Sequence, residues 1–195
     1  IVVSGQEGMH KPNPAIFRLI CERYNIEAAK SIYIDDNTGG TRCDCLKPAG
    51  SACNLDCTYC FYLSKQSLPG GPGGGHMSEE ILESFIRDYI ESVTADEVVF
   101  SWQGGEPTLM GLGFFEKVVA LQTKHAKPGQ RIENDLQTNG TLLDDDWARF
   151  LKARNFLVGL SIDGPREIHD HYRITKRGEP TFDAVCNAAH TLRRF

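Results

Sequence analysis

The 195-residue sequence has no apolar stretch that approaches the roughly 18 residues of a membrane-spanning helix, and no signal peptide opens it. An excess of basic residues is also lacking, since 21 Lys and Arg stand against 26 Asp and Glu, a formal net charge of −5. Phosphate binding needs a clustered basic surface. We therefore expect a cytoplasmic protein whose partner is neither a membrane nor a nucleic acid. The first residue is Ile1 rather than Met, so we expect a fragment.

The cysteine pattern argues against a disulfide framework, because the count is odd and no secretory signal precedes it. The seven positions are Cys21, Cys43, Cys45, Cys53, Cys57, Cys60 and Cys186. Five of them fall within 43–60, which indicates a metal site. The other two stand alone on helix-like segments and are interpreted as small buried hydrophobic residues.

Hydrophobic periodicity divides the chain into two unequal parts. Residues 1–40 predict a short αβ appendage, with a helix at 15–24, a strand at 31–34 and a break at 37–40. Residues 46–195 form the larger domain, in which strands and helices alternate. The glycine-rich residues 69–76 predict a surface loop between the first strand and the first helix.

The alternation in the larger part predicts an α/β fold of about four parallel βα units. The expected strands are 97–102, 131–137 and 156–162, with one more just before Cys53; the expected helices are 79–93, 114–125, 144–154 and 181–194. On the first helix, the predicted inner face carries Ile81, Phe85, Tyr89 and Ile90. Functional residue types follow three strands, at 104–106, 137–139 and 161–163. Because carboxyl ends of parallel strands share one edge, we expect them on one rim.

The run from Cys53 to Cys60 has the spacing C-x3-C-x2-C. Three thiolates on one short loop can ligate three irons of a [4Fe–4S] cluster and leave the fourth iron open for a ligand. A zinc site that borrows Cys43 or Cys45 as its fourth ligand is an alternative, although zinc usually takes two C-x2-C pairs. Unligated thiols are a second alternative.

With Tyr59 as the aromatic residue before the last cysteine, this motif resembles the signature of radical S-adenosylmethionine (SAM) enzymes. The wider context resembles the anaerobic sulfatase-maturating enzymes. The matching segments are 47–63, 102–109, 137–143, 161–165 and 168–170 together with Arg173. The resemblance implies a partial (β/α)6 barrel that is truncated at its C-terminal end.

The resemblance also implies two cofactors. A [4Fe–4S] cluster would be ligated by Cys53, Cys57 and Cys60, and SAM would chelate its open iron through amino and carboxylate groups. Tyr59 would pack beside the cluster, on the adenine side.

Five further residues would contact SAM according to the resemblance. Gly104, Gly105 and Glu106 resemble the motif that meets the methionine amino group, where glycine permits a close backbone approach and a carboxylate suits an ammonium. Ser161 resembles the residue near the ribose and carboxylate, and Arg173 the one that pairs with the SAM carboxylate.

Taken singly, each of these features has a plainer interpretation. A Gly-Gly-Glu run is usually a turn beside a solvated acid, and Asn139–Gly140 is a turn signal. Ser161 alone could cap a loop, and Arg173 lies in a charged stretch that is solvated by default. His169 and His171 could be ligands, but the family assigns them no metal role. The joint occurrence of Glu106, Ser161 and Arg173 on one rim, behind the C-x3-C-x2-C loop, favours the functional interpretation for these three residues.

The implied activity is oxidation of a cysteine or serine of a sulfatase to Cα-formylglycine, with a flavodoxin or ferredoxin as electron donor. The family's catalytic base would lie beyond Phe195, so no catalytic residue is expected within this chain. Another radical SAM peptide maturase, or an inactive truncated chimera that only binds the cluster, is the alternative. Residues 1–40 resemble a C-terminal fragment of haloacid-dehalogenase-like hydrolases, through segments 11–17 and 34–37.

Overall fold

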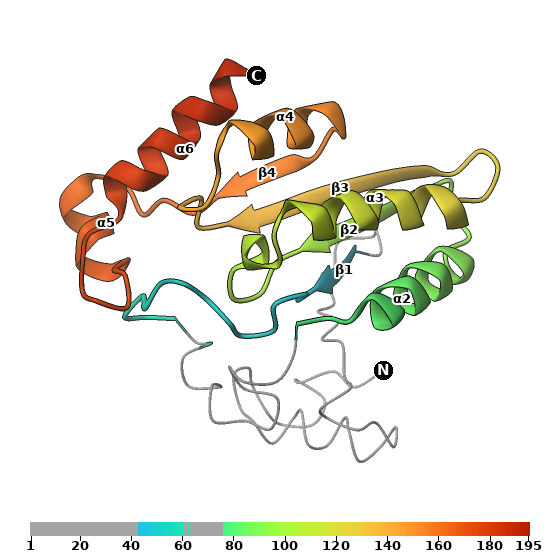
Figure 1. The fold of residues 1–195 in the computed structure, drawn as a ribbon, viewed down its shortest axis with the longest axis horizontal. Helices are drawn as coiled ribbons and strands as arrows, with labels where there is room; N and C mark the ends of the chain where they lie inside the picture. Colours follow the sequence, from blue (N-terminus) through green and yellow to red (C-terminus); the bar gives the residue numbers. More distant parts are fainter. Residues whose placement is uncertain (1–42, 61, 63–75) are drawn as a thin grey trace, which may run out of the picture.

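The computed structural model describes residues 43–60, 62 and 76–195, and its centre is a four-stranded sheet (Figure 1). The strands lie in the order β1-β2-β3-β4, and every neighbouring pair is parallel. Their bounds are β1 Cys43–Leu46, β2 Glu97–Trp102, β3 Arg131–Thr138 and β4 Leu157–Leu160. The predicted α/β class is confirmed. All strands therefore end at one rim of the sheet.

Helices connect consecutive strands or follow the last one. They are α2 Glu79–Ser92, η3 Pro107–Met110, α3 Leu112–His125, α4 Asp145–Ala153, α5 Arg166–Tyr172 and α6 Phe182–Arg194. Two of them begin at a side-chain cap, because Ser78 accepts from the backbone N–H of Ile81 and Asp144 from that of Trp147. The acids at the start of α4 are thus a helix N-terminus, as the sequence indicates.

The core lies between the sheet and the helices α2, α3 and α4. Its centre is aromatic: Phe115 contacts Trp102, Trp147 and Phe156 edge to face, with ring centroids 5.4–6.2 Å apart. Edge-to-face pairs add to the free energy of area burial. A buried polar pair, Gln122 and Asn134, is fully hydrogen-bonded inside this core. The helices thus hold the sheet from one side and leave its rim to the loops.

Three of the predicted element boundaries need correction. The strand expected just before Cys53 ends at Leu46, because the following segment folds into turns, in which Gly50 N–H donates to Lys47 C=O and Ala52 N–H to Ala49 C=O. The fourth strand is shorter than expected, and α3 begins two residues earlier, at Leu112. The expected strand 97–102 is confirmed residue for residue.

The predicted inner face of α2 is wrong by one position at its start. Ile81 is 39% exposed, whereas Leu82 and Ile86 are fully buried. Leu82, Ile86 and Tyr89 follow the i, i+4, i+7 spacing of one helical face. The adjacent apolar residue Ile81 made the start of that face ambiguous in the sequence.

Helix α5 was not expected from the sequence. Its residues are charged and polar, so they lack the apolar periodicity that predicts a helix. The helix follows Pro165, whose extended backbone begins it, and its C-cap is Arg173, whose N–H donates to His169 C=O at 2.7 Å. Arg173 therefore has a defined position at the end of a helix, whereas the sequence alone placed it in a solvated, charged stretch.

The predictions for residues 1–40, including the hydrolase-like appendage, and for the loop at 69–75 lie outside the described residues. Across the part that the structure describes, none of the helices combines the length and the apolar character needed to cross a membrane.

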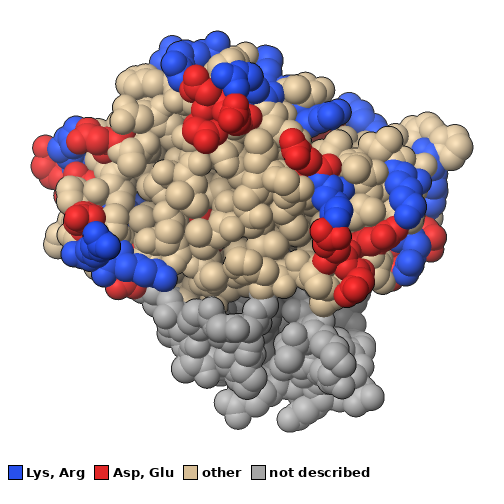
Figure 2. Space-filling view, in the orientation of Figure 1, with Lys and Arg blue, Asp and Glu red and all other residues tan. Residues whose placement is uncertain are grey.

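Acidic and basic side chains alternate around an uncharged area on the face shown in Figure 2. Two ion pairs join neighbouring helices: Glu79 of α2 pairs with Lys117 of α3, and Glu83 of α2 with Lys124 of α3. Such exposed pairs contribute little to stability.

Candidate functional site

The residues just before the cysteine loop, which is defined as residues 53–60, are bound by the segment after β2. Gly105 N–H donates to Gly50 C=O (3.0 Å), and Glu106 N–H donates to Ala52 C=O (2.8 Å). A Cβ at residue 105 would lie 2.0 Å from Ala52 O, so only glycine permits this approach. Gly104 adopts φ +126° beside the same turn. Both glycines thus anchor the residues that lead into the cysteine loop.

The opposite side of the cysteine loop is bound by the segment after α5. Asp56 N–H donates to Ile174 C=O (2.8 Å) and Thr58 N–H to Tyr172 C=O (2.9 Å). Leu55 and Thr175 form an antiparallel bridge. The loop is therefore held between two backbone segments that are far apart in the sequence.

The three predicted ligand thiols are free cysteines on this loop, and Cys57 is buried. Burial raises the pKa of Cys53, and it raises the pKa of Cys57 to about 11 although the positive charge of Arg173 opposes the shift. A bound metal would be needed to hold them as thiolates.

No three His, Cys, Asp or Glu side chains of the described ranges converge on a point where one metal ion could be held. A cubane cluster requires no such convergence, because each thiolate ligates a different iron. Three free thiols on one short loop, of which Cys57 is buried, therefore fit a cluster.

Glu106 is 1% exposed, and its carboxylate accepts four hydrogen bonds from the chain itself. Oε1 accepts from the N–H and the hydroxyl of Thr108 (3.0 and 2.6 Å) and from the hydroxyl of Thr138 (2.7 Å). Oε2 accepts from Asn139 N–H (2.7 Å). A carboxylate has about four lone-pair sites. The donors fill the sites of Oε1 and leave one at Oε2, so the side chain is directed into the protein.

The main-chain carbonyls are the other polar groups of the same motif. Among the described residues, no backbone N–H donates to the carbonyl oxygens of Gly104 and Gly105. Carbonyl oxygens are suitable acceptors for an ammonium group. The motif can therefore meet a cation through its main chain.

Asn139 connects the Glu106 carboxylate to the cysteine loop. Its Oδ1 accepts from both the N–H and the hydroxyl of Thr141 (3.0 and 2.8 Å). This fixes the amide so that Nδ2 donates to Asn54 Oδ1 (2.9 Å) and lies 3.8 Å from Cys53 Sγ. The Asn139 bond lowers the pKa of Cys53, against the larger rise from burial. A donor to a ligand sulfur is one of the groups that set a cluster's potential.

Arg173 lies on the other side of the loop. Its guanidinium lies over the ring of Tyr59, 5.6 Å from the centroid, and its Nε is 2.9 Å from Asp163 Oδ2. This ion pair lacks the alignment of a hydrogen bond, so the buried Nε has no hydrogen-bond partner among the described atoms. The arginine side chain is 16% exposed. A guanidinium has five N–H donors, and the ion pair with Asp163 is made through Nε, so the cation is compatible with a second, anionic partner.

The Asp163 carboxylate also accepts a hydrogen bond from the hydroxyl of Tyr59, at 2.5 Å. Burial by itself would raise the pKa of Asp163, but the interactions with Tyr59 and Arg173 outweigh it and lower the pKa. The carboxylate is thus ionised and holds two predicted SAM-contacting residues together.

Ser161 follows β4, and its N–H donates to Thr138 C=O at 2.9 Å. Its hydroxyl accepts from Gln137 Nε2 at 2.9 Å. All the predicted site residues therefore lie on the rim. The Glu106 side chain is directed into the protein, and the contacts that Asn139 and Asp163 make were not predicted. Their only sequence signal was membership of the segments 137–143 and 161–165.

Comparison with known proteins agrees with this geometry. Residues 48–195 match the Radical SAM superfamily. The chain is 47% identical over 149 residues to the serine-type anaerobic sulfatase-maturating enzyme of Bacteroides thetaiotaomicron (76% of this chain, 36% of that protein). It is 47% identical over 150 residues to the cysteine-type enzyme of Clostridium perfringens (77% and 40%). The chain thus spans about two fifths of the length of these relatives.

Solved structures show the same likeness. Native anSMEcpe with bound AdoMet and a Cp18Cys peptide is 46% identical, with a TM-score of 0.70 over 78% of this chain and 40% of that one. Native anSMEcpe with bound AdoMet is 48% identical, with a TM-score of 0.71 over 77% and 40%. This chain belongs to the radical SAM superfamily.

Proposed function

We propose that this chain carries the SAM-activating part of an anaerobic sulfatase-maturating enzyme, which oxidises a cysteine or serine of a sulfatase to Cα-formylglycine. The observation that carries the proposal is the position of the cysteine loop. Backbone hydrogen bonds hold residues 50–58 between the Gly104–Glu106 backbone and the segment that bears Arg173, so a ligand on the thiols would meet carbonyls on one side and a cation on the other.

The thiols of Cys53, Cys57 and Cys60 would each ligate one iron of a [4Fe–4S] cluster. When bound and reduced, that cluster supplies the electron for reductive cleavage of SAM. The fit rests on the three free thiols of one short loop, of which Cys57 is buried. Leu55 N–H, 3.4 Å from Cys53 Sγ, and Asn139 would donate to that ligand sulfur.

We assign the SAM-binding roles from the groups that lie on each side of the cysteine loop. The carbonyls of Gly104 and Gly105 would accept from the methionine ammonium, while the Glu106 carboxylate shapes this motif from within. Arg173 would pair with the SAM carboxylate through the guanidinium edge that Asp163 leaves open. Ser161 would lie near the ribose, and Tyr59 would cover the adenine side.

The remaining features belong to the whole protein. A sulfatase polypeptide would be the substrate, and a flavodoxin or ferredoxin would donate the electron. The four-stranded sheet would be part of a (β/α)6 barrel, and the catalytic base would lie outside this chain. Residues 1–40 stay interpreted as a fragment that resembles haloacid-dehalogenase-like hydrolases.

The cluster is tested by anaerobic reconstitution of the full chain with iron and sulfide. About four irons per chain are expected, as a cubane requires. Cys53→Ala, Cys57→Ala and Cys60→Ala should each abolish the brown absorbance. Cys186→Ala, on α6, is the control and should retain it. Stoichiometric zinc with no iron after reconstitution would overturn the cluster assignment.

A further inference from the structure

His169 is a fully buried side chain of α5 that the proposed chemistry does not use. Both of its ring nitrogens have partners. Nδ1 is 3.3 Å from the backbone N of Asp163, and Nε2 is 3.0 Å from the hydroxyl of Thr181. That hydroxyl donates in turn to Arg173 C=O at 2.7 Å. One imidazole therefore connects the backbones of Asp163 and Arg173, whose side chains form the ion pair.

The tautomer of this histidine follows from its partners. Thr181 has a single hydroxyl proton, and it goes to Arg173 C=O, so the hydroxyl oxygen must accept from Nε2–H. Nδ1 is then the unprotonated nitrogen, as the N–H of Asp163 requires. Burial, with the charge of Arg173, lowers the pKa of His169, while Asp170 and Asp163 act in the opposite direction. The ring is neutral at neutral pH.

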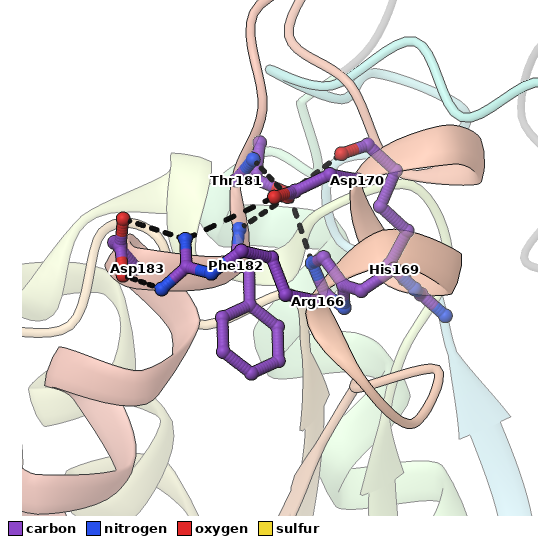
Figure 3. Close-up of polar contacts among 7 residues, drawn as sticks. Arg166, His169, Asp170, Thr181, Phe182 and Asp183 are labelled. Atoms are coloured by element: carbon purple, nitrogen blue, oxygen red, sulfur yellow. Dashed lines mark hydrogen bonds and ion pairs between the residues drawn. The ribbon is translucent and has the colours of Figure 1, made fainter.

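Thr181 is itself held in place, as Figure 3 shows. Asp170 Oδ1 accepts from the N–H of Thr181 (3.0 Å) and of Phe182 (2.8 Å). Arg166 of α5 makes a bidentate pair with Asp183 of α6 (2.6 and 2.8 Å). These contacts already join the two helices, so the imidazole is not needed for that purpose.

We propose that His169 is a positioning residue for SAM binding. By holding the backbones of Asp163 and Arg173 at fixed spacing, it sets the direction in which the Arg173 guanidinium meets the SAM carboxylate. The inference rests on the proposed function, because it assigns Arg173 to SAM. It adds a residue that lies outside the cofactor contacts and acts through two others.

Matched substitutions separate the contact of His169 with Asp163 from its contact with Thr181. In His169→Asn, the amide lies near the position of Nδ1 and can serve Asp163 alone. In His169→Gln, it lies near the position of Nε2 and can serve Thr181 alone. Thr181→Val keeps the shape but removes the hydroxyl, and Thr181→Ser keeps the hydroxyl. The Thr181 pair tests the inference even where a His169 variant does not fold.

The measurement is the SAM dissociation constant of the reconstituted full chain, with iron content determined alongside. Thr181→Val and both His169 variants should weaken SAM binding about 3- to 10-fold, the effect of losing one hydrogen bond, at unchanged iron content. Thr181→Ser should bind as the parent does. Asp183→Asn breaks the ion pair on the same two helices and should leave SAM affinity unchanged.

A second readout needs no cofactor. In the metal-free chain, hydrogen exchange followed by mass spectrometry should be faster in peptides that cover 161–175 for Thr181→Val, but not for Thr181→Ser. Unchanged exchange together with unchanged SAM affinity in Thr181→Val would overturn the inference.

Arg173→Ala distinguishes a failure of this inference from a failure of the proposed function on which it rests. If Arg173→Ala binds SAM as the parent does, the SAM role of Arg173 fails and the inference fails with it. If Arg173→Ala weakens binding and Thr181→Val does not, only the inference fails. If Thr181→Val weakens binding equally in the Arg173→Ala background, the hydroxyl acts independently of Arg173, which also overturns the inference. The expected result is no further loss in the double variant.

Discussion

Glu106 and Asp163 are two carboxylates on the same rim, one after β2 and one after β4, with different surroundings. Glu106 is 1% exposed and accepts four hydrogen bonds from threonine and asparagine residues of the neighbouring segments. The Asp163 side chain is 25% exposed and contacts Tyr59 and Arg173, both of which are predicted to meet SAM. Glu106 stabilises the rim from inside, and Asp163 lies beside two residues that we propose as SAM contacts.

The difference teaches that a motif acid need not contact the ligand. The four donors around Glu106 are neutral groups of the chain, so the carboxylate joins the ends of β2 and β3. Asp163 is paired with Arg173, and both side chains remain partly exposed to solvent. Burial and the type of partner, rather than residue type, separate a structural carboxylate from one that orients a binding residue.

Glu106→Ala should produce the largest effect on stability. It leaves the hydroxyls of Thr108 and Thr138 and two backbone N–H groups without their acceptor in a buried site, which should cost about 3 kcal/mol in the free energy of unfolding. Urea unfolding of the metal-free chain measures it. Asp163→Ala is the matched comparison, and an equal loss in both variants would contradict the distinction between the two carboxylates.

Gly105→Ala should cost about 2 kcal/mol or more, because the new Cβ would lie 2.0 Å from Ala52 O and one backbone must move. Gly113→Ala, in α3, is the control. Nothing lies within 4 Å of its added Cβ, so helix propensity should make it neutral or stabilising by about 0.5 kcal/mol. The shift of the cysteine loop in Gly105→Ala should also lower the iron content after reconstitution. Parent-like stability and iron content would show that the close approach is not required.

Asp163→Ala should change stability by only about 1 kcal/mol, since its ion pair is partly solvated. Its main effect should be on SAM affinity, because Arg173 and Tyr59 lose their common partner. We expect roughly 3- to 10-fold weaker binding, measured by equilibrium dialysis, with iron content unchanged. Asp163→Asn should lie between alanine and the parent. A purely structural Asp163 would instead lower stability and leave SAM affinity unchanged.

The smallest effect should be a pH dependence from His169. Its pKa is lowered in the folded chain by burial. Below about pH 6.5, where an unfolded histidine becomes protonated, the unfolded chain takes up a proton that the folded chain does not. The contribution to stability is therefore complete above that pH and is lost as the pH falls toward the lowered folded pKa. Urea unfolding at pH 7.5 and 5.5 should show this slope, and His169→Gln should reduce it.

Much of the fold could be predicted from local patterns. The strand 97–102 was readable because a strand's alternation involves only near neighbours. Helix α5 was not, because its polar residues carry no apolar stripe. Ile81 was misplaced because two adjacent apolar residues leave the helix face ambiguous by one position.

The cysteine spacing and the functional residues after each strand are properties of the sequence itself, and they sufficed to predict the rim and the cluster loop. The direction of each side chain on that rim was decided by tertiary structure. Glu106 is directed inward by Asn139, 33 residues away, and Tyr59 is held by Asp163, 104 residues away. A hydrogen bond depends on the distance and angle between two groups, and those depend on how the parallel strands align, which no local pattern in the chain encodes.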